Sequence, residues 1–262
     1  MQRCVRSIFL DADMSDEPSE VTYDDMNANR VVIEHQNVVG ENFGGQRISQ
    51  FVSIESRFDS CTFDGIEIAS ASFGAGRGMS EYVGCSFMDA RIHMNAGGFA
   101  RFIDCSFEKV QIDHWFCFAV ELIGCTFSGR LSKAIFNGSV PADNHGMAGR
   151  VVNRFEGNDF SRADLVDVSF RTGIDLDKQR LPAGDGYVRL ADAVDAMRRA
   201  RVAYESWESV EDKAAARGVL HVLEQDVAAG QRQLLVRVDD YPPSTRHAVR
   251  ALLNAAQPSD EV

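Results

Sequence analysis

The phrases YVGCSF (residues 82–87), FIDCSF (residues 102–107) and LIGCTF (residues 122–127) decide the fold of this chain, because they recur at intervals of twenty residues. Each phrase carries cysteine and phenylalanine in the same two positions. Self-similarity at a fixed period is the sequence signature of stacked structural repeats. The three phrases therefore predict a solenoid whose coils are each about twenty residues long.

A finer period of five residues runs through the same region. Counted in fives, residues 33–73 are apolar at every step except Ser53, and residues 82–127 are apolar at every step except Gly97. The pattern returns at Phe155, Phe160, Leu165 and Phe170. A period of five matches neither the 3.6-residue period of a helix nor the two-residue period of a strand. It does match a coil with four flat sides and one pentad on each side.

Small residues lie two positions before many of the large ones. The segment ADL (residues 163–165) is the clearest unit, and NDF (158–160), CTF (61–63) and CSF (105–107) are close to it. In this pattern the chain resembles the pentapeptide-repeat family over about residues 31–172. The resemblance implies a right-handed, four-sided parallel β-helix. We therefore expect a mainly β fold of this kind with an α-helical region at the C-terminus.

Stacking four pentads per coil predicts columns of like side chains inside the rod. Equivalent residues of neighbouring coils should lie about 4.8 Å apart, a spacing that suits stacked rings and branched aliphatic side chains. Trp115 should occupy space left by the missing side chain of Gly97. The predicted core columns contain Phe43, Phe63, Phe87, Phe107, Phe127 and Phe160, then Ile48, Ile68, Ile92, Ile112 and Leu165, and the small residues Cys61, Cys85, Cys105 and Cys125.

Two insertions interrupt the period, near residues 74–81 and near residues 130–152. The second contains the segment NGSVPADNHGMAGR, which is rich in turn residues and typical of an exposed loop. Loops that project from a uniform rod are natural places for contact with a partner. Asp143 and His145 of this loop are therefore candidate partner-binding residues.

The sequence divides into an N-terminal segment or cap (residues 1–29), the β-helix (30–176) and a helical region (177–262) that would cover the end of the rod or form a dimer. Helices are expected over residues 187–208, from a capping box at Ser209 to residue 229, and from a cap at Ser244 or Thr245 to residue 256. Residues 233–238 fit either a strand or more helix.

The chain has a formal net charge of −12, and residues 20–176 carry 21 acidic and 13 basic side chains. This sign excludes binding to nucleic acid through phosphate neutralisation. The apolar run near the N-terminus is too short for a signal peptide, and none reaches the about 18 residues of a membrane span. A cytoplasmic protein with reduced, inward-facing cysteines is the expected class.

Motifs for catalysis, cofactors or metals are lacking in the sequence. The cysteine column forms a line without a CxxC motif, so we expect no metal site there. His93 lies one coil below Asp113, which predicts a surface ion pair of no catalytic importance. The glycine-rich segments match no phosphate-binding motif, and no nucleophile motif has supporting context. A non-enzymatic protein without a cofactor is therefore expected.

Two functions compete. The rod is similar to the quinolone-resistance members of the family, and this resemblance implies a homodimeric DNA mimic that binds DNA gyrase, a type II topoisomerase. The rod has about half the charge density of DNA, so mimicry would require its acids to gather on one face. The alternative is a scaffold for another protein, in toxin immunity or phage defence, that binds through the long loop or the C-terminal helices. The outward acidic candidates for contact with a partner are Asp64, Glu67, Asp89, Asp104, Glu108 and Asp113, and Asp164 and Asp167 are further outward acids.

Overall fold

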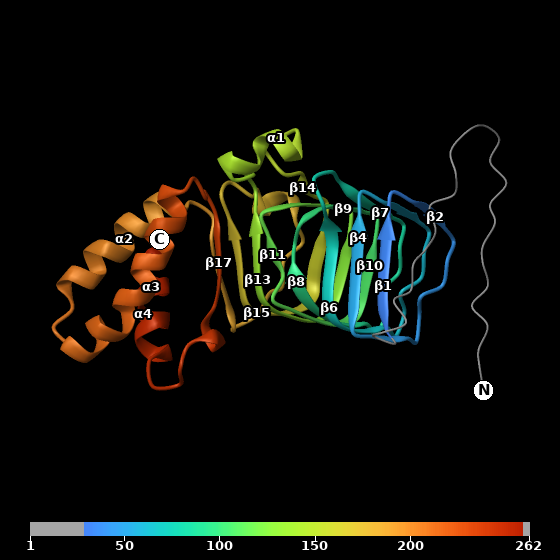
Figure 1. The fold of residues 1–262 in the computed structure, drawn as a ribbon. Coiled ribbons are helices and arrows are strands. Elements are labelled where there is room, and N and C mark those ends of the chain that lie inside the picture. Colours follow the sequence, from blue (N-terminus) through green and yellow to red (C-terminus); the bar gives the residue numbers. More distant parts are fainter. Residues whose placement is uncertain (1–28, 259–262) are drawn as a thin grey trace, which may run out of the picture.

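Parallel β-strands are stacked coil upon coil through most of the chain (Figure 1). The structure is a computed structural model that describes residues 29–258, so the predicted N-terminal segment lies outside the described residues except for Asn29. A nine-stranded sheet contains β1 (Arg30–Glu34), β3 (Arg47–Ile48), β4 (Gln50–Ile54), β6 (Glu67–Ala75), β8 (Arg91–Ala96), β10 (Ser106–Asp113), β11 (Phe116–Cys117), β13 (Thr126–Asn137) and β15 (Asp159–Arg171). A six-stranded sheet contains β2 (Asn37–Val39), β5 (Arg57–Asp59), β7 (Ser80–Val83), β9 (Phe99–Ile103), β12 (Ala119–Ile123) and β14 (Phe155–Glu156). The predicted parallel β-solenoid with C-terminal helices is confirmed.

Aromatic rings form ladders inside the solenoid. Phe63, Phe87 and Phe107 stack with ring centroids 4.7 and 4.6 Å apart, close to the spacing of paired strands. Phe127 continues the stack to Phe160 with a centroid distance of 4.4 Å. The predicted Phe, Ile and Cys columns are buried, except that Phe43 of the first coil is only partly buried. Burial of large rings in register therefore fixes how the coils stack.

A second aromatic ladder explains one gap in the five-residue pattern. Tyr82 stacks between Phe58 and Phe102, with centroid distances of 4.6 Å on both sides. Its hydroxyl donates to Ser53 Oγ at 2.7 Å, and both side chains are fully buried. Ser53 is the apparent exception to the apolar rule because it pairs with the only polar atom of this ladder.

The second insertion is shorter than the expected 130–152, because residues 130–137 belong to β13. In the register of β10 and β13, Ile112 pairs with Leu131, which is nineteen residues later instead of twenty. Leu131 and Phe136 thus continue two core columns and are fully buried. A count in strict fives misses both of them, because one residue is absent after Phe127. The exposed part of the insertion contains the 3-10 turn η1 (Ala142–Asn144) and α1 (His145–Ala148).

The prediction that Trp115 occupies the space beside Gly97 is wrong. A Cβ atom on Gly97 would lie 2.2 Å from the carbonyl oxygen of Phe116, so backbone and not the indole fills this space. Trp115 is instead buried against Phe102 and Phe107, with centroid distances of 5.6 and 5.8 Å.

The first insertion, expected at residues 74–81, is a turn between β6 and β7 whose Arg77 and Gly78 amides donate to Glu55.

The C-terminal region contains α2 (Ala193–Ser206), α3 (Val210–Ala228) and α4 (Arg246–Ala256), which have a hydrophobic core of their own. Ser209 caps α3 as predicted, accepting from the Asp212 amide at 3.1 Å. The expected helix over residues 187–208 is wrong at its start, because β16 (Tyr187–Leu190) pairs antiparallel with β17 (Leu234–Arg237). This pairing also identifies residues 234–237 as a strand. Thr245 is the residue before α4, but its side chain makes no capping hydrogen bond.

Side chains from the C-terminal region pair the backbone at the last coil of the solenoid. Gln231 accepts from the amides of Gly173 and Ile174 at 2.9 and 3.1 Å, and the Tyr187 hydroxyl accepts from the Leu165 amide at 3.0 Å. Unpaired amide groups at an exposed sheet end would otherwise invite further strand pairing. Figure 1 shows the helices standing against this end of the solenoid. Among residues 29–258, no helix is both long enough and apolar enough to cross a membrane.

Candidate functional site

Several of the acidic residues predicted to contact a partner are paired with other groups of the rod. Glu67 lies between Arg47 and Arg91, at 2.9 and 3.2 Å, and Glu108 contacts Arg162 at 3.3 Å. Asp64 accepts from the Ser86 hydroxyl and from the Met88 amide, which ties two neighbouring coils together. These carboxylates are engaged with other groups of the rod itself.

Two more of the predicted acids, Asp89 and Asp104, are corner residues. Their φ angles are 55° and 52°, in the left-handed region that aspartate tolerates better than most residues. Equivalent corners of other coils carry Gly65 and Gly84, with φ angles of 64° and 58°. The backbone requirement at these corners explains both aspartates without any partner.

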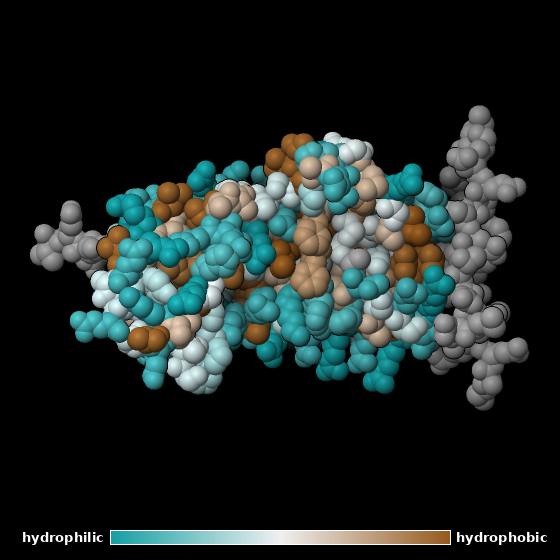
Figure 2. Space-filling model, turned by 60° about the vertical axis from the view of Figure 1, so that its left-hand side comes forward, coloured by the Kyte–Doolittle hydropathy of each residue, from teal (hydrophilic) through white to brown (hydrophobic). Residues whose placement is uncertain are grey.

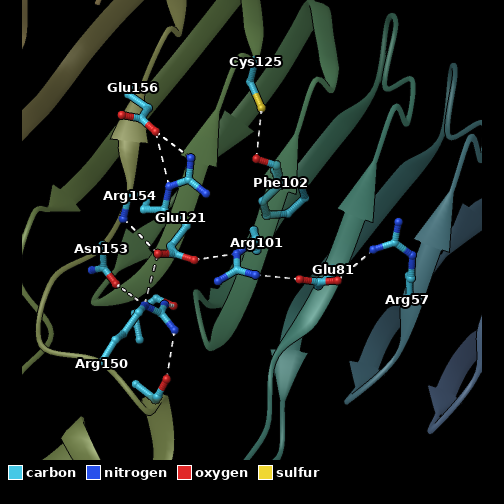
Figure 3. A network of polar contacts seen from close by, with 12 residues as sticks. Arg57, Glu81, Arg101, Phe102, Glu121, Cys125, Arg150, Asn153, Arg154 and Glu156 are labelled. Atoms are coloured by element: carbon cyan, nitrogen blue, oxygen red, sulfur yellow. Dashed lines mark hydrogen bonds and ion pairs between the residues drawn. The ribbon is translucent and has the colours of Figure 1, made fainter. Parts of the chain in front are cut away.

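Outward positions of the six-stranded sheet form a ladder of alternating charge (Figure 3). Arg57, Glu81, Arg101 and Glu121 follow one another on successive strands β5, β7, β9 and β12. The guanidinium-to-carboxylate distances along this ladder are 2.8, 2.7 and 2.6 Å. A second ladder on the nine-stranded sheet carries Arg47, Glu67, Arg91, Gln111, Arg130 and Asp164 in register. The net negative charge of the rod is therefore interleaved with positive charge on both sheets.

Glu121 is the buried end of the first ladder, with only 1% of its side chain exposed. It accepts from Arg101 Nε at 2.6 Å and from the Arg154 amide at 2.9 Å, and it lies 3.4 Å from Arg150 Nε. Burial is the largest single effect on the pKa of Arg101 and lowers it, but the hydrogen bonds and charges of Glu121 and Glu81 together outweigh burial and raise that pKa. Burial lowers the pKa of Arg150, with the nearby Arg101 charge acting in the same direction. A buried carboxylate of this kind is tolerated only when it is fully paired.

The network at Glu121 anchors the long loop to the solenoid wall (Figure 3). Arg150 donates to the carbonyl oxygen of Ala119 at 2.7 Å and to Asn153 Oδ1 at 3.2 Å. Asn153 in turn donates to the carbonyl oxygens of Phe118 and Asn137 at 3.0 and 2.9 Å. Both ends of the segment 150–153 are thus held against β12 and β13. The C-terminal end of the loop is therefore tied to the solenoid.

Four hydrophobic side chains are exposed where this loop meets the solenoid, and we call them the loop patch. Their exposed fractions are 49% for Phe118, 44% for Met147, 56% for Val151 and 61% for Val152. Val151 and Val152 lie between the anchoring residues Arg150 and Asn153, and the Asn153 side chain donates to the carbonyl oxygen of Phe118, which brings this part of the loop close to Phe118. Figure 2 shows hydrophobic side chains gathered at the top of the molecule, at the height of α1 in Figure 1. Exposed apolar groups of this kind mark interaction surfaces when they are contiguous.

The two loop residues predicted to bind a partner differ in their roles. Asp143 is exposed in η1, four residues before Met147 of the loop patch. His145 is half-buried, and its Nε2 lies 2.8 Å from the carbonyl oxygen of Val140, so it supports the turn. Sequence reasoning missed the loop patch itself. Its signal was the pair Val151–Val152 inside a polar loop, but which loop residues stay exposed depends on the fold.

The cysteine column is a packing feature. Cys61, Cys85, Cys105, Cys117 and Cys125 are free thiols and are buried. The Cys85 and Cys105 thiols donate to backbone carbonyl oxygens of Phe58 and Tyr82. The contact with the Cys105 thiol, together with burial, raises the pKa of Cys85 to about 12. Protonated thiols of this kind fill space beside the aromatic ladders and are poor metal ligands.

Comparisons with known proteins add a distant likeness. No protein-family model and no curated protein matches the chain. Among solved structures, a trypsin-treated point variant of QnrB1, a plasmid-mediated fluoroquinolone resistance protein, is 15% identical to this chain. The match covers 53% of this chain and 83% of that chain, with a TM-score of 0.15. A likeness this distant carries no argument about function.

Proposed function

We propose that this protein acts by binding another protein, without catalysis, and that the loop patch is the centre of its binding surface. The observation that carries this proposal is the exposure of Phe118 on the solenoid and of Met147, Val151 and Val152 on a loop tied to it by the network at Glu121. Side chains presented in a fixed arrangement lose little conformational entropy on binding. A few well-packed side chains at the centre of an interface carry most of its binding free energy.

The proposed partner has an apolar depression that receives the loop patch, surrounded by polar groups. The loop supplies a polar rim, with Asp143 exposed and the Arg150 guanidinium close behind. Binding of this kind depends on removing apolar surface from water, so it should persist at high salt.

Mimicry of DNA towards a type II topoisomerase is the more specific hypothesis, and it stays a prediction. It requires a surface whose negative charge is continuous, since DNA carries one charge per about 1.7 Å. Glu67, Glu81 and Glu121 are each bonded to arginine on the two charge ladders, which favours the loop patch over the ladders as the binding surface. The homodimer expected from the family resemblance is likewise a prediction, and light scattering of the purified chain measures it.

The test is affinity capture from a bacterial lysate at low and high salt, with and without added duplex DNA. The purified chain is compared with the variant Phe118→Ser/Val152→Ser. Val39→Ser is the matched control, because Val39 is 55% exposed at the opposite end of the solenoid. We expect a partner that is retained at high salt, lost with the double variant and kept with the control.

Two results would overturn the proposal. Recovery of a topoisomerase that is abolished by salt and by DNA, yet unchanged in the double variant, would establish mimicry instead. Recovery that is lost in Val202→Ser but not in the double variant would assign binding to the helices, where Val202 is 65% exposed on α2.

A further inference from the structure

His93, Asp113 and His114 form a cluster on the outer face of the nine-stranded sheet, away from the loop patch. In the register of β8 and β10, His93 pairs directly with Asp113. His93 Nδ1 lies 3.0 Å from both carboxylate oxygens of Asp113, and His114 Nδ1 lies 2.9 Å from Asp113 Oδ2. The pair of His93 and Asp113 was predicted from the sequence, but the third member was not.

The backbone at His114 brings the third side chain into the cluster. His114 has a left-handed φ of 60°, so the chain turns at this corner immediately after β10. This turn brings the imidazole of His114 back beside its own neighbour, with its ring centroid 4.9 Å from that of His93. Two imidazoles from different coils therefore converge on one carboxylate.

We propose that this cluster binds a divalent transition metal ion, Zn²⁺ in the first instance, through His93, Asp113 and His114. One potential ligand atom from each residue lies within 4.8 Å of the others. Ligand atoms of a tetrahedral zinc site are about 3.3 Å apart, since zinc bonds to nitrogen and oxygen are about 2.0–2.2 Å long. To admit the ion in place of the shared hydrogens, the nitrogen-to-carboxylate distances of 2.9 and 3.0 Å would lengthen by a few tenths of an ångström, and the two imidazole nitrogens would settle at the same separation from each other. Two imidazole nitrogens and one carboxylate are a ligand set that zinc and its neighbours in the transition series accept.

The surroundings leave room for the ion and for its remaining ligands. On the neighbouring coils, the positions equivalent to His93 and Asp113 carry the small residues Ala69 and Ser132, and all four line one groove. The side chains of His93, Asp113 and His114 are 49%, 39% and 35% exposed, so water can complete the coordination. Arg91 and Arg130 line the same groove. Their guanidinium groups would favour an anion as the exogenous ligand of the bound metal.

The test is titration of the full chain with Co²⁺, followed by visible absorption, and with Zn²⁺, followed by calorimetry. Every protein carries Cys4→Ser, so that the thiol outside the described residues cannot bind metal. We expect one ion per chain, with the intense visible bands of cobalt in a low-symmetry nitrogen and oxygen site. Loss of one ligand should weaken binding by at least the ~10- to 100-fold typical of an outer-shell partner.

The test variants are His93→Ala and His114→Asn, and asparagine is chosen at the corner because it tolerates left-handed backbone. His221→Ala is the matched control, since His221 is an exposed histidine on α3 outside the cluster. Circular dichroism verifies the fold of each protein before titration. Absence of cobalt bands in the parent chain would overturn the proposal, as would zinc affinity unchanged in both test variants. If either variant fails to fold, the other decides the question.

Discussion

Replacing Glu121 with alanine is expected to destabilise the solenoid and to release the loop at the same time. Glu121 has 1% of its side chain exposed and pairs with Arg101 and Arg150, whose side chains are 30% and 14% exposed. Removing one partner of a buried ion pair typically costs about 3–5 kcal/mol, because the remaining charge is left without compensation. The guanidinium groups here can regain some water, so we expect a loss near about 3 kcal/mol in the free energy of unfolding. For a chain of this size, that corresponds to a fall in Tm of about 6–12 °C.

The matched control for this substitution is Glu81→Ala on the same ladder. Glu81 also contacts two arginines, Arg57 and Arg101, but 27% of its side chain is exposed. Exposed ion pairs contribute only about 0.2–1 kcal/mol each, so this variant, which loses two partly exposed pairs, should lose less than about 2 kcal/mol. Comparison of the two variants separates the effect of burial from the loss of a carboxylate.

Urea denaturation measures the stability of both variants, and hydrogen exchange measures the loop. The Arg154 amide donates to Glu121 Oε1, so its exchange should accelerate in Glu121→Ala and stay slow in Glu81→Ala. A third variant, Glu121→Gln, retains an acceptor for this amide and should protect it better than alanine does. Equal stability losses in the two alanine variants, with an unchanged Arg154 amide, would refute the anchoring role of Glu121.

Three further predictions concern the core. Tyr82→Phe should lower the free energy of unfolding by about 1–3 kcal/mol, because it leaves the buried Ser53 hydroxyl without its partner. Adding Ser53→Ala should recover much of that loss. A double-mutant cycle by urea denaturation measures the coupling between Tyr82 and Ser53, and purely additive effects would contradict the predicted role of their hydrogen bond. Phe107→Ala should cost about 3–5 kcal/mol in the same assay, since it removes a ring from the middle of the ladder; a near-neutral result would contradict the inward column. In a Cys4→Ser background, no thiol should react with iodoacetamide in the native state from pH 7 to pH 9, because the described thiols are buried and the raised pKa of Cys85, about 12, keeps it protonated through this range. Rapid native labelling of Cys85 would show that the column opens.

The aromatic and aliphatic columns could be predicted from the sequence because only large apolar side chains recur at a period of five. The count failed after Phe127, where one residue is missing from the coil and the buried Leu131 and Phe136 fall out of step. It also treated Ser53 as a gap, since a hydrogen bond to Tyr82 on the next coil has no period. A periodic pattern predicts only the side chains that recur in every coil. The shifted register after Phe127 and the hydrogen bond between Ser53 and Tyr82 each occur at one place.

Residues 187–190 illustrate a different limit. Val188 and Leu190 alternate with polar neighbours as in a strand, yet they also fit the apolar spacing of the helix that follows. The partner that decides the outcome, β17, is more than forty residues away in the sequence.

The candidate binding surfaces were harder still to predict. The loop patch is defined by what the fold leaves uncovered, and the cluster at Asp113 needs a backbone turn that places His114 beside His93 of the preceding coil.

The alternating charge ladders have a consequence for how the chain finds its order. Inside the solenoid the coils are nearly interchangeable, because the rings of Phe63, Phe87 and Phe107 would stack equally well in any order. Skipping the coil of residues 62–85 during folding would preserve the stacking of the remaining rings, although it would remove Tyr82, the partner of Ser53. It would also set Arg57 against Arg101 on one sheet and Arg47 against Arg91 on the other, since the lost coil carries both Glu67 and Glu81. The outward charges thus differ from coil to coil although the core side chains repeat. Repulsion between like charges disfavours an incorrect pairing of coils that core packing alone would permit.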